Sequence, residues 1–291
     1  MRRSLVLVFL VACGGVDIGD YRGAALDAEC DYLVKCGLFP DSASCKAQFG
    51  PLLLDNPSVE AAVDAGKLDY DGDAADDCFD ALSSASCSRD AVSSTACDHI
   101  FTGKIPDGGA CAFEEECVSG NCVLSDCTMA CCPGTCAPTR PVPGIGQPCT
   151  FECVDDAYCG SDSTCQATLP KGAACDDTQA CSRGLYCAGR TTTTAGTCST
   201  LPKTGEPCTT TCDDIGDRCN AGTCTPLGLP GASCMTDNDC SFFYACDATM
   251  HCAAEPDPMR QPNGSMCTSS VDCQSHYCGN DNLCSDVPLC I

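Results

Sequence analysis

Cysteine is the residue that most constrains how this chain can fold. The sequence contains 35 cysteines among 291 residues, which exceeds the ~8–10% of residues that marks a disulfide scaffold. Large aromatic side chains are scarce, since the chain has no Trp, 9 Phe and 7 Tyr. We therefore expect a small disulfide-rich fold, in which an N-terminal all-α domain stapled by disulfides precedes tandem modules of irregular or short β structure.

The first twelve residues have the organisation of an export signal. Two basic residues, Arg2 and Arg3, precede an apolar run from Leu5 to Val11, and a small residue follows it. The run is far shorter than the ~20 residues that an α-helix needs to cross a bilayer. We expect residues 1–12 to direct export of the chain and then to be removed.

The sequence Leu-Val-Ala-Cys that ends at Cys13 resembles the lipobox of bacterial lipoproteins. The resemblance implies that Cys13 becomes the first residue, carries acyl chains such as palmitate, and anchors residues 13–19 as a membrane tether. Gly14, in place of Asp, implies transfer to an outer membrane or cell surface. Lipidation also removes one cysteine from an odd total, so the rest can pair completely. The alternative is an ordinary secretory signal.

The chain is strongly acidic, with 40 Asp and Glu against 15 Lys and Arg. Removal of Arg2 and Arg3 with the signal would leave 13 basic residues. Nucleic acids and anionic lipid headgroups are attracted by basic patches, so we expect neither as a partner. The charge favours a solvated, self-repelling surface; the alternatives are a basic partner and weak Ca²⁺ binding.

Residues 20–104 have the apolar spacing of helices. A first helix carries Leu26, Cys30 and Leu33 and ends at Gly37, because glycine commonly stops helices. Four more helices are expected, and Pro51 should break or kink the second. Their N-terminal caps are Asp41, Asn56, Asp71 or Asp73, and Asp90, and the third and fifth end near Gly66 and at Phe101.

Six cysteines lie in this helical domain, and six can pair in fifteen ways. They are Cys30, Cys36, Cys45, Cys78, Cys87 and Cys97. The pairing that we favour is Cys30–Cys78, Cys36–Cys45 and Cys87–Cys97.

From about Pro106 the sequence becomes a repeat rich in Gly, Pro, Thr, Ser and Asp. Each copy opens with Pro or Gly, a further glycine and a few residues before its first cysteine, as in Pro230-Gly-Ala-Ser-Cys234. These openings divide the rest of the chain into unit 1 (105–141), unit 2 (142–169), unit 3 (170–200), unit 4 (201–228), unit 5 (229–256) and unit 6 (257–291, including a C-terminal tail).

Units 2 to 6 each contain four framework cysteines, and unit 1 contains seven. The framework cysteines are Cys149, Cys153, Cys159 and Cys165; Cys175, Cys181, Cys187 and Cys198; Cys208, Cys212, Cys219 and Cys224; Cys234, Cys240, Cys246 and Cys252; Cys267, Cys273, Cys278 and Cys284. Those of unit 1 are Cys111, Cys117, Cys122, Cys127, Cys131, Cys132 and Cys136, and Cys290 stands alone near the end.

Disulfides must stabilise these units, because chains this short bury too little apolar surface to fold unaided. Each bridge contributes roughly 2–4 kcal/mol by restricting the unfolded chain. Four cysteines allow three pairings. We favour first-to-third and second-to-fourth bonds, which interlock two loops. In units 5 and 6 these are Cys234–Cys246, Cys240–Cys252, Cys267–Cys278 and Cys273–Cys284.

Three local patterns accompany the cysteines. An acidic residue precedes the second cysteine, as in Asp239-Cys240, and tyrosine precedes the third, as in Tyr277-Cys278. Unit 1 contains a Cys-Cys-Pro-Gly turn that begins at Cys131. In these features the units resemble Dickkopf N-terminal and colipase-like cysteine-rich repeats, which occur in tandem in bacterial surface lipoproteins. The resemblance implies this architecture and a surface location, and the lipobox argues against the Wnt antagonism of the animal proteins.

Metal binding is not favoured by the sequence. It has no Cys-x2-Cys knuckle of the kind that structural zinc sites use, and exported proteins meet an oxidising environment. Asp69, Asp71, Asp73 and Asp80 match positions of a calcium loop, but Ala74 stands where that loop needs glycine. We expect Asp71 and Asp73 to cap or begin a helix, and we expect no cofactor and no metal.

Catalytic motifs are absent from the sequence as well. The three histidines are His99, His251 and His276, and no nucleophile elbow, phosphate loop, zinc-protease motif or redox Cys-x-x-Cys accompanies them. We therefore expect a protein that is not an enzyme. The densest aromatic cluster, Phe242-Phe243-Tyr244, either anchors a partner or, as we favour, packs on a disulfide.

These features favour a lipid-anchored surface protein that acts as an extracellular binding or adhesion module for an unknown envelope protein or glycan. One alternative is a structural spacer or envelope-stiffening protein. A disulfide-rich protease inhibitor is a further alternative, although the loop between the third and fourth cysteines varies in length from unit to unit. An inhibitor would present one exposed loop at a constant position.

Overall fold

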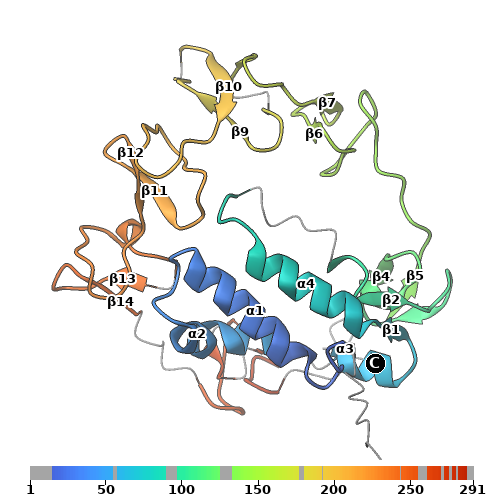
Figure 1. Ribbon diagram of the computed structural model, residues 1–291. Coiled ribbons are helices and arrows are strands. Elements are labelled where there is room, and N and C mark those ends of the chain that lie inside the picture. Colours follow the sequence, from blue (N-terminus) through green and yellow to red (C-terminus); the bar gives the residue numbers. More distant parts are fainter. Residues whose placement is uncertain are drawn as a thin grey trace, which may run out of the picture.

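The structure is a computed structural model of the chain (Figure 1). It describes residues 15–54, 58–89, 97–124, 133–176, 180–191, 193–242, 244–254, 261–269, 272–274, 277–279 and 281–286. The proposed signal, Cys13 and four further cysteines lie outside the described residues, and so does His276. These four are Cys127, Cys131, Cys132 and Cys290. The fold class is the predicted one, with helices first and short disulfide-bonded strands after them.

Helix α1 (Tyr21–Lys35) is the centre of the helical domain and packs against both α2 (Ser42–Leu54) and α4 (Gly72–Ser84). Its buried residues include Leu26, Cys30 and Leu33, as the helical spacing predicts. Gly37 follows it with φ of 71°, and the Leu38 N–H donates to the Leu33 carbonyl at 2.9 Å. The helix therefore ends in the glycine stop that the sequence indicates.

Caps predicted from the sequence begin two of the helices. The Asp41 carboxylate accepts a 2.7 Å hydrogen bond from the Ser44 N–H at the start of α2. Asp71 caps α4 by accepting from two backbone N–H groups of its first turn. Helix α2 continues past Pro51 to Leu54, so the expected break there is wrong. A proline beyond the first turn removes one backbone hydrogen bond, and α2 continues for three residues after Pro51 despite this loss.

The last expected helix, from Asp90 to Phe101, is wrong where the structure describes it. Residues 97–100 form a turn, and β2 (Phe101–Gly103) then pairs antiparallel with β1 (Leu68–Tyr70), which follows the short helix α3 (Ser58–Asp64). The Phe101 ring lies 5.1 Å from that of Tyr21, centroid to centroid. Packing of Phe101 in this aromatic cluster overrides the helical spacing of the segment.

Each repeat unit is built on a small antiparallel hairpin. The strands are β3 (Ala110–Cys111), β4 (Cys122–Leu124) and β5 (Gly134–Cys136) in unit 1, β6 (Ala157–Cys159) and β7 (Cys165–Ala167) in unit 2, and β8 (Ala174–Cys175), β9 (Leu185–Ala188) and β10 (Gly196–Thr200) in unit 3. Those of unit 4 are β11 (Asp217–Asn220) and β12 (Thr223–Pro226), and those of unit 5 are β13 (Tyr244–Cys246) and β14 (Cys252–Ala254). The described residues of unit 6 form isolated antiparallel bridges, between Cys278 and Cys284 and between Met266 and Leu283.

The glycine of each opening motif explains why the motif recurs. In all six units it has φ between 82° and 88°, a region that favours glycine. Its N–H donates to the carbonyl of the last framework cysteine at 2.7 or 2.8 Å. These glycines are Gly108, Gly146, Gly172, Gly205, Gly231 and Gly264. The opening turn thus closes each unit onto the end of its hairpin.

Units 1 to 5 follow one another as an arc around the helical domain (Figure 1). Unit 1 is attached at one end, where the Lys67 ammonium lies 3.2 Å from the Glu116 carboxylate. Units 4 and 5 return to the helical domain at the other end. There the Ser88 hydroxyl donates to the Asp213 carboxylate at 2.7 Å, across 125 positions of sequence.

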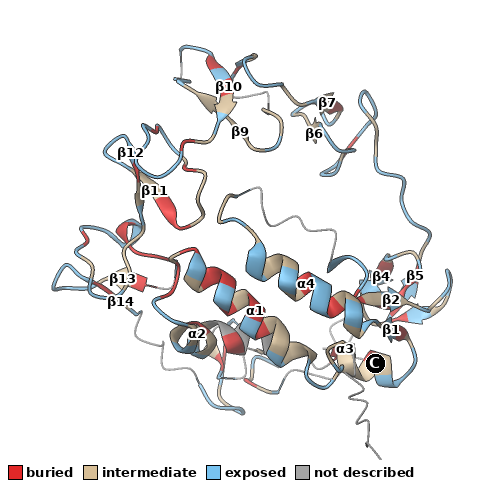
Figure 2. Ribbon diagram, in the orientation of Figure 1, coloured by how far each residue is buried: buried red, intermediate tan, exposed pale blue. Residues whose placement is uncertain are grey.

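Burial follows this arrangement (Figure 2). The largest core cluster combines residues of α1 and the following loop, such as Leu33 and Phe39, with Tyr244 and cysteines of unit 5. The rings of Phe39 and Tyr244 meet edge to face at 6.0 Å. Units 2 and 3, at the top of the arc, are mostly exposed or half-buried and bury chiefly their cysteines.

Candidate functional site

One disulfide pattern holds for every unit of the repeat. The first cysteine bonds to the third and the second to the fourth, and units 5 and 6 have the four bonds that we favoured from the sequence. The other bonds of this pattern are Cys149–Cys159, Cys153–Cys165, Cys175–Cys187, Cys181–Cys198, Cys208–Cys219 and Cys212–Cys224. Unit 1 follows it through Cys111–Cys122 and Cys117–Cys136. Its extra cysteines thus lie in an insertion between the third and fourth framework positions.

The hairpin explains the pattern. Its register places the third cysteine directly opposite the fourth, as with Cys246 and Cys252 in unit 5. Residues opposite each other across a hairpin point to the same face of the sheet. Each of the two can therefore bond to a cysteine of the preceding loop, and the two bonds lie side by side beneath the hairpin.

The pairing that we favoured in the helical domain is wrong. The structure joins Cys30 to Cys45, Cys36 to Cys87, and Cys78 to Cys97. The first bond links α1 to α2, and the second links the end of α1 to the segment after α4. Because α1 packs between two helices, the partner of each cysteine depends on which neighbour its side of the helix meets.

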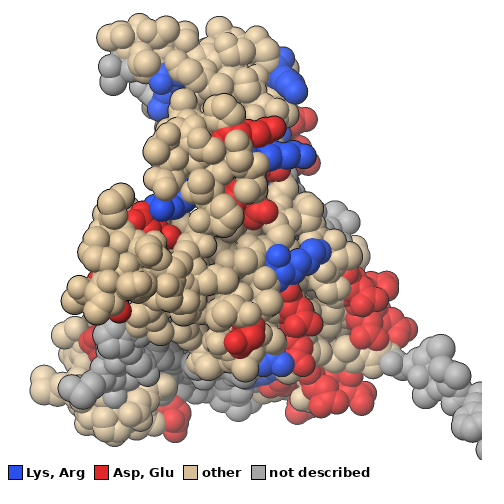
Figure 3. All heavy atoms as spheres, turned by 60° about the vertical axis from the view of Figure 1, so that its left-hand side comes forward, with Lys and Arg blue, Asp and Glu red and all other residues tan. Residues whose placement is uncertain are grey.

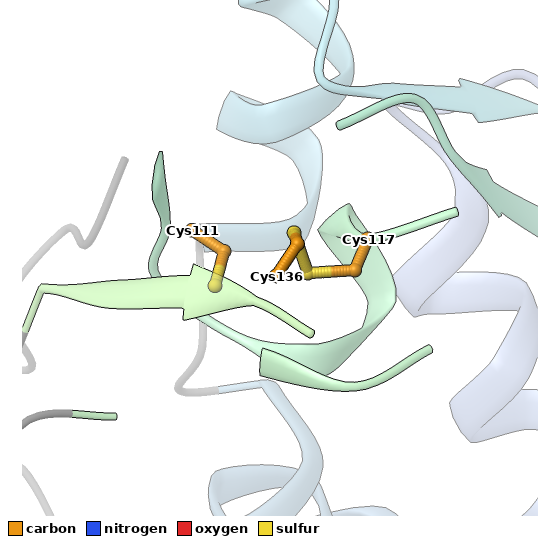
Figure 4. Close-up of side chains that lie close together, drawn as sticks. All are labelled: Cys111, Cys117 and Cys136. Atoms are coloured by element: carbon orange, nitrogen blue, oxygen red, sulfur yellow. A yellow bond between two sulfur atoms is a disulfide. The ribbon is translucent and has the colours of Figure 1, made fainter. Parts of the chain in front are cut away.

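Clusters of three sulfur atoms occur in the described units, each within 4.8 Å, and could be mistaken for metal sites. In Figure 4 the sulfurs of Cys117 and Cys136 are bonded to each other, and Cys111 lies beside them. The third sulfur belongs to the neighbouring disulfide, Cys111–Cys122. Metal ions bind free thiolates, and a sulfur atom in a disulfide is not a thiolate. In the oxidised protein these clusters therefore form the cores of the units.

The acidic residue before the second cysteine has a structural task. The Asp239 carboxylate accepts hydrogen bonds from the Met235 and Thr236 N–H groups, at 2.5 and 3.1 Å. Asp272 and Glu116 make the corresponding contacts in units 6 and 1. The Met235 N–H, together with the Arg218 guanidinium of unit 4, lowers the pKa of Asp239 to about 2. This carboxylate therefore orders the loop after the first cysteine and links unit 5 to unit 4.

The aspartates that match a calcium loop have other partners. Asp69 forms a 2.7 Å ion pair with Lys104, and Asp71 caps α4. Asp69, Asp71 and Asp73 line an open depression with His99. The structure places Asp71 and Asp73 as the cap-and-helix interpretation expects, and Asp69 lies in β1.

The remaining histidine within the described residues, His251, belongs to a turn. The ring Nδ1 of His251 lies 2.8 Å from the Thr249 carbonyl, and the backbone N–H of His251 donates to the Asp247 carboxylate at 3.1 Å. These contacts hold the tip of the β13–β14 hairpin. The structure does not bring His251 and His99 together, since they lie in different parts of the fold.

The aromatic cluster that the sequence singles out divides between two environments. Tyr244 is buried against Phe39, whereas the Phe242 side chain is 67% exposed, and Phe243 lies outside the described residues. The packing that we favoured thus applies to Tyr244, with the helical domain as its partner. Phe242 remains on the surface.

One highly exposed aromatic side chain was missed in the sequence. Phe151 of unit 2 is 91% exposed, and it lines two open depressions of about 720 and 450 Å³. Both depressions are lined by Val142, Thr150, Phe151 and Glu152, which we call the Phe151 surface. No signal in the sequence distinguishes Phe151, because it is a single aromatic residue between two cysteines.

Charge is distributed unevenly over the surface. On the face shown in Figure 3 acidic side chains gather at the lower right, while basic side chains lie singly and scattered over the face. Unit 2 contains Glu152, Asp155, Asp156 and Asp162 and no lysine or arginine. The exposed apolar residues of unit 2 therefore belong to a unit of net negative charge.

Comparisons of the chain with protein-family models, with curated proteins and with solved structures found no match. The fold by itself defines the class: a disulfide-rich protein in which a helical domain precedes cysteine-rich repeats. Disulfides persist in oxidising surroundings, so their number indicates an extracellular or otherwise oxidising environment. Within the part of the chain that the structure describes, no helix has the length and apolar character needed to cross a membrane.

Proposed function

We propose that this chain is a non-enzymatic, lipid-anchored binding protein of the cell surface. The observation that carries the proposal is the Phe151 surface. An aromatic side chain that is 91% exposed gains most by burial against a partner, and aromatic residues dominate the energy of protein interfaces. Two covalent bonds, Cys149–Cys159 and Cys153–Cys165, hold this surface in place.

The arrangement of the units supports binding over a spacer. A spacer gains length from units that follow one another in a line, but units 4 and 5 return to the helical domain. Units 2 and 3 are thereby held at both ends as an arch. In this arrangement Phe151 remains 91% exposed, so an envelope protein or glycan can reach it.

Export and lipidation rest on the resemblance of Leu-Val-Ala-Cys13 to a lipobox and on the odd number of cysteines. We expect metabolic labelling with palmitate to mark the wild-type protein and not the Cys13→Ser variant. The variant should leave the membrane fraction, because its anchor is missing. Equal labelling of both proteins would contradict the anchor.

A photo-reactive phenylalanine analogue at position 151 tests the binding function in intact cells. We expect a discrete cross-linked product that is absent when the analogue replaces Phe242. Phe242 is a matched control, since both residues are exposed phenylalanines two positions after a framework cysteine. Absence of a product at position 151, or the same products at both positions, would contradict the proposal.

A further inference from the structure

We propose that the partner of the Phe151 surface is a basic polypeptide segment that carries bulky apolar side chains. The inference rests on the binding function proposed above and specifies the chemistry of the partner. It is drawn from the shape, rigidity and charge of unit 2.

The shape suits side chains rather than an enclosed small molecule. The larger depression lies between Phe151 and the start of the hairpin, where Ala157 and Tyr158 line it. The smaller one is lined by Phe151 together with the segment that precedes Cys149. Both are open to solvent, so an apolar side chain from a larger chain can enter each while Phe151 contacts the segment between them.

Rigidity favours binding through this surface. Pro141, Pro143 and Pro148 line the smaller depression, and proline fixes φ at one value. The Cys149–Cys159 bond holds the segment that bears Phe151 against the hairpin. A surface that is already ordered loses little conformational entropy when a partner binds.

The negative charge of unit 2 determines which partners this surface attracts. Glu152 lines both depressions, Asp155 and Asp156 are exposed in the segment that follows it, and unit 2 contains no basic residue. Arg140, just before unit 2, is the one basic residue among those that line the two depressions. Carboxylates around an apolar contact attract a cationic partner and repel acidic ones, and this excludes anionic lipids and nucleic acids.

Binding of defined peptides to the full oxidised protein tests this inference. The first probe is a short peptide of lysine and leucine, the second has glutamate in place of lysine, and the third has serine in place of leucine. We expect the first to bind with an affinity that falls as salt is added. The other two should bind about tenfold or more weakly, because each lacks one of the two attractions.

Matched variants locate the binding. Phe151→Ser should weaken binding of the lysine–leucine peptide about tenfold or more, whereas Phe242→Ser should leave it unchanged. The triple variant Glu152→Gln, Asp155→Asn, Asp156→Asn should weaken binding at low salt and flatten the salt dependence. Asp156 has φ of 60°, a conformation that asparagine also adopts, so the triple variant preserves the fold.

Two results would overturn the inference. Equal losses from Phe151→Ser and Phe242→Ser would show a general attraction to a polyanion. Equal affinity for the glutamate–leucine peptide, still dependent on Phe151, would show that the partner is apolar but not basic. The second result leaves the proposed binding function intact. The cross-linking experiment at position 151 tests that function separately.

Discussion

At the scale of single residues, one carboxylate explains a recurring feature of the repeat. Asp239, Asp272 and Glu116 precede the second cysteine and accept hydrogen bonds from the backbone after the first. Asp239 also pairs with Arg218, and Glu116 with Lys67, so in units 1 and 5 the same side chain joins the unit to what precedes it in the chain. An acidic residue there stabilises both the loop and the junction.

The lowered pKa of Asp239 predicts how the stability of unit 5 depends on pH. Since the pKa is about 2 in the folded protein and 3.8 ordinarily, the carboxylate stabilises the fold above about pH 4. That stabilisation is lost as the pH falls from about 4 to about 2. The protection of unit 5 amides against hydrogen exchange, relative to the intrinsic exchange rate at each pH, should therefore fall over this range in the wild type and less steeply in Asp239→Asn. Identical pH dependence in both proteins would contradict this role.

At the scale of elements, the opening turn and the hairpin define the unit. The turn requires a left-handed residue, and glycine provides it without strain. The hairpin sets the third cysteine against the fourth. Both features are local, so the sequence contains what is needed to find the units and to favour their disulfides.

Two glycine substitutions of opposite effect test the turn. Gly205 has φ of 82° with open space around it, so Gly205→Ala should destabilise unit 4 by about 1–2 kcal/mol through backbone strain alone. Gly23 lies within α1, also in open space, so Gly23→Ala should stabilise α1 by about 1 kcal/mol. Hydrogen exchange resolved by peptide would measure both changes. Stabilisation by Gly205→Ala would refute the turn.

The disulfides of the helical domain could not be predicted in the same way. Helical spacing shows which residues share a face, but not which neighbouring helix that face meets. Cys30 bonds to α2 and Cys36 to the segment after α4, a choice made by tertiary packing. The exposure of Phe151 could not be predicted from the sequence either, because burial of a lone aromatic residue depends on how the units are arranged in the arc.

At the scale of the whole molecule, the arc is closed by contacts between distant parts of the sequence. The Ser241 hydroxyl donates to the Leu38 carbonyl at 2.6 Å across 203 positions, and both groups are buried. The Arg89 side chain donates to the Cys212 carbonyl at 2.9 Å. The helical domain and the repeats therefore form one body, with units 2 and 3 as the span between its two attachments.

Removal of one buried hydroxyl tests this closure. Ser241→Ala leaves the Leu38 carbonyl without its donor, which costs about 1–3 kcal/mol. Exchange of amides around the end of α1 should accelerate about tenfold or more. Ser182→Ala is the matched control, since Ser182 also follows a second framework cysteine but contacts Thr168 at the end of the preceding repeat unit and not the helical domain. Equal effects of the two variants at α1 would exclude the closure.

Because of this closure, residues that are synthesised early must wait for packing partners that are synthesised late. Phe39, 1% exposed in the finished fold, packs on Tyr244 of unit 5. Ribosomes add ~5–20 residues per second, so the 203 positions between Leu38 and Ser241 correspond to roughly 10–40 s of synthesis. For that interval the segment after α1 lacks part of its cover, and for most of it the six cysteines of the helical domain, the last of which is Cys97, are already present in the chain. Disulfides that form early within the helical domain would keep this surface in its folded conformation until unit 5 has been synthesised.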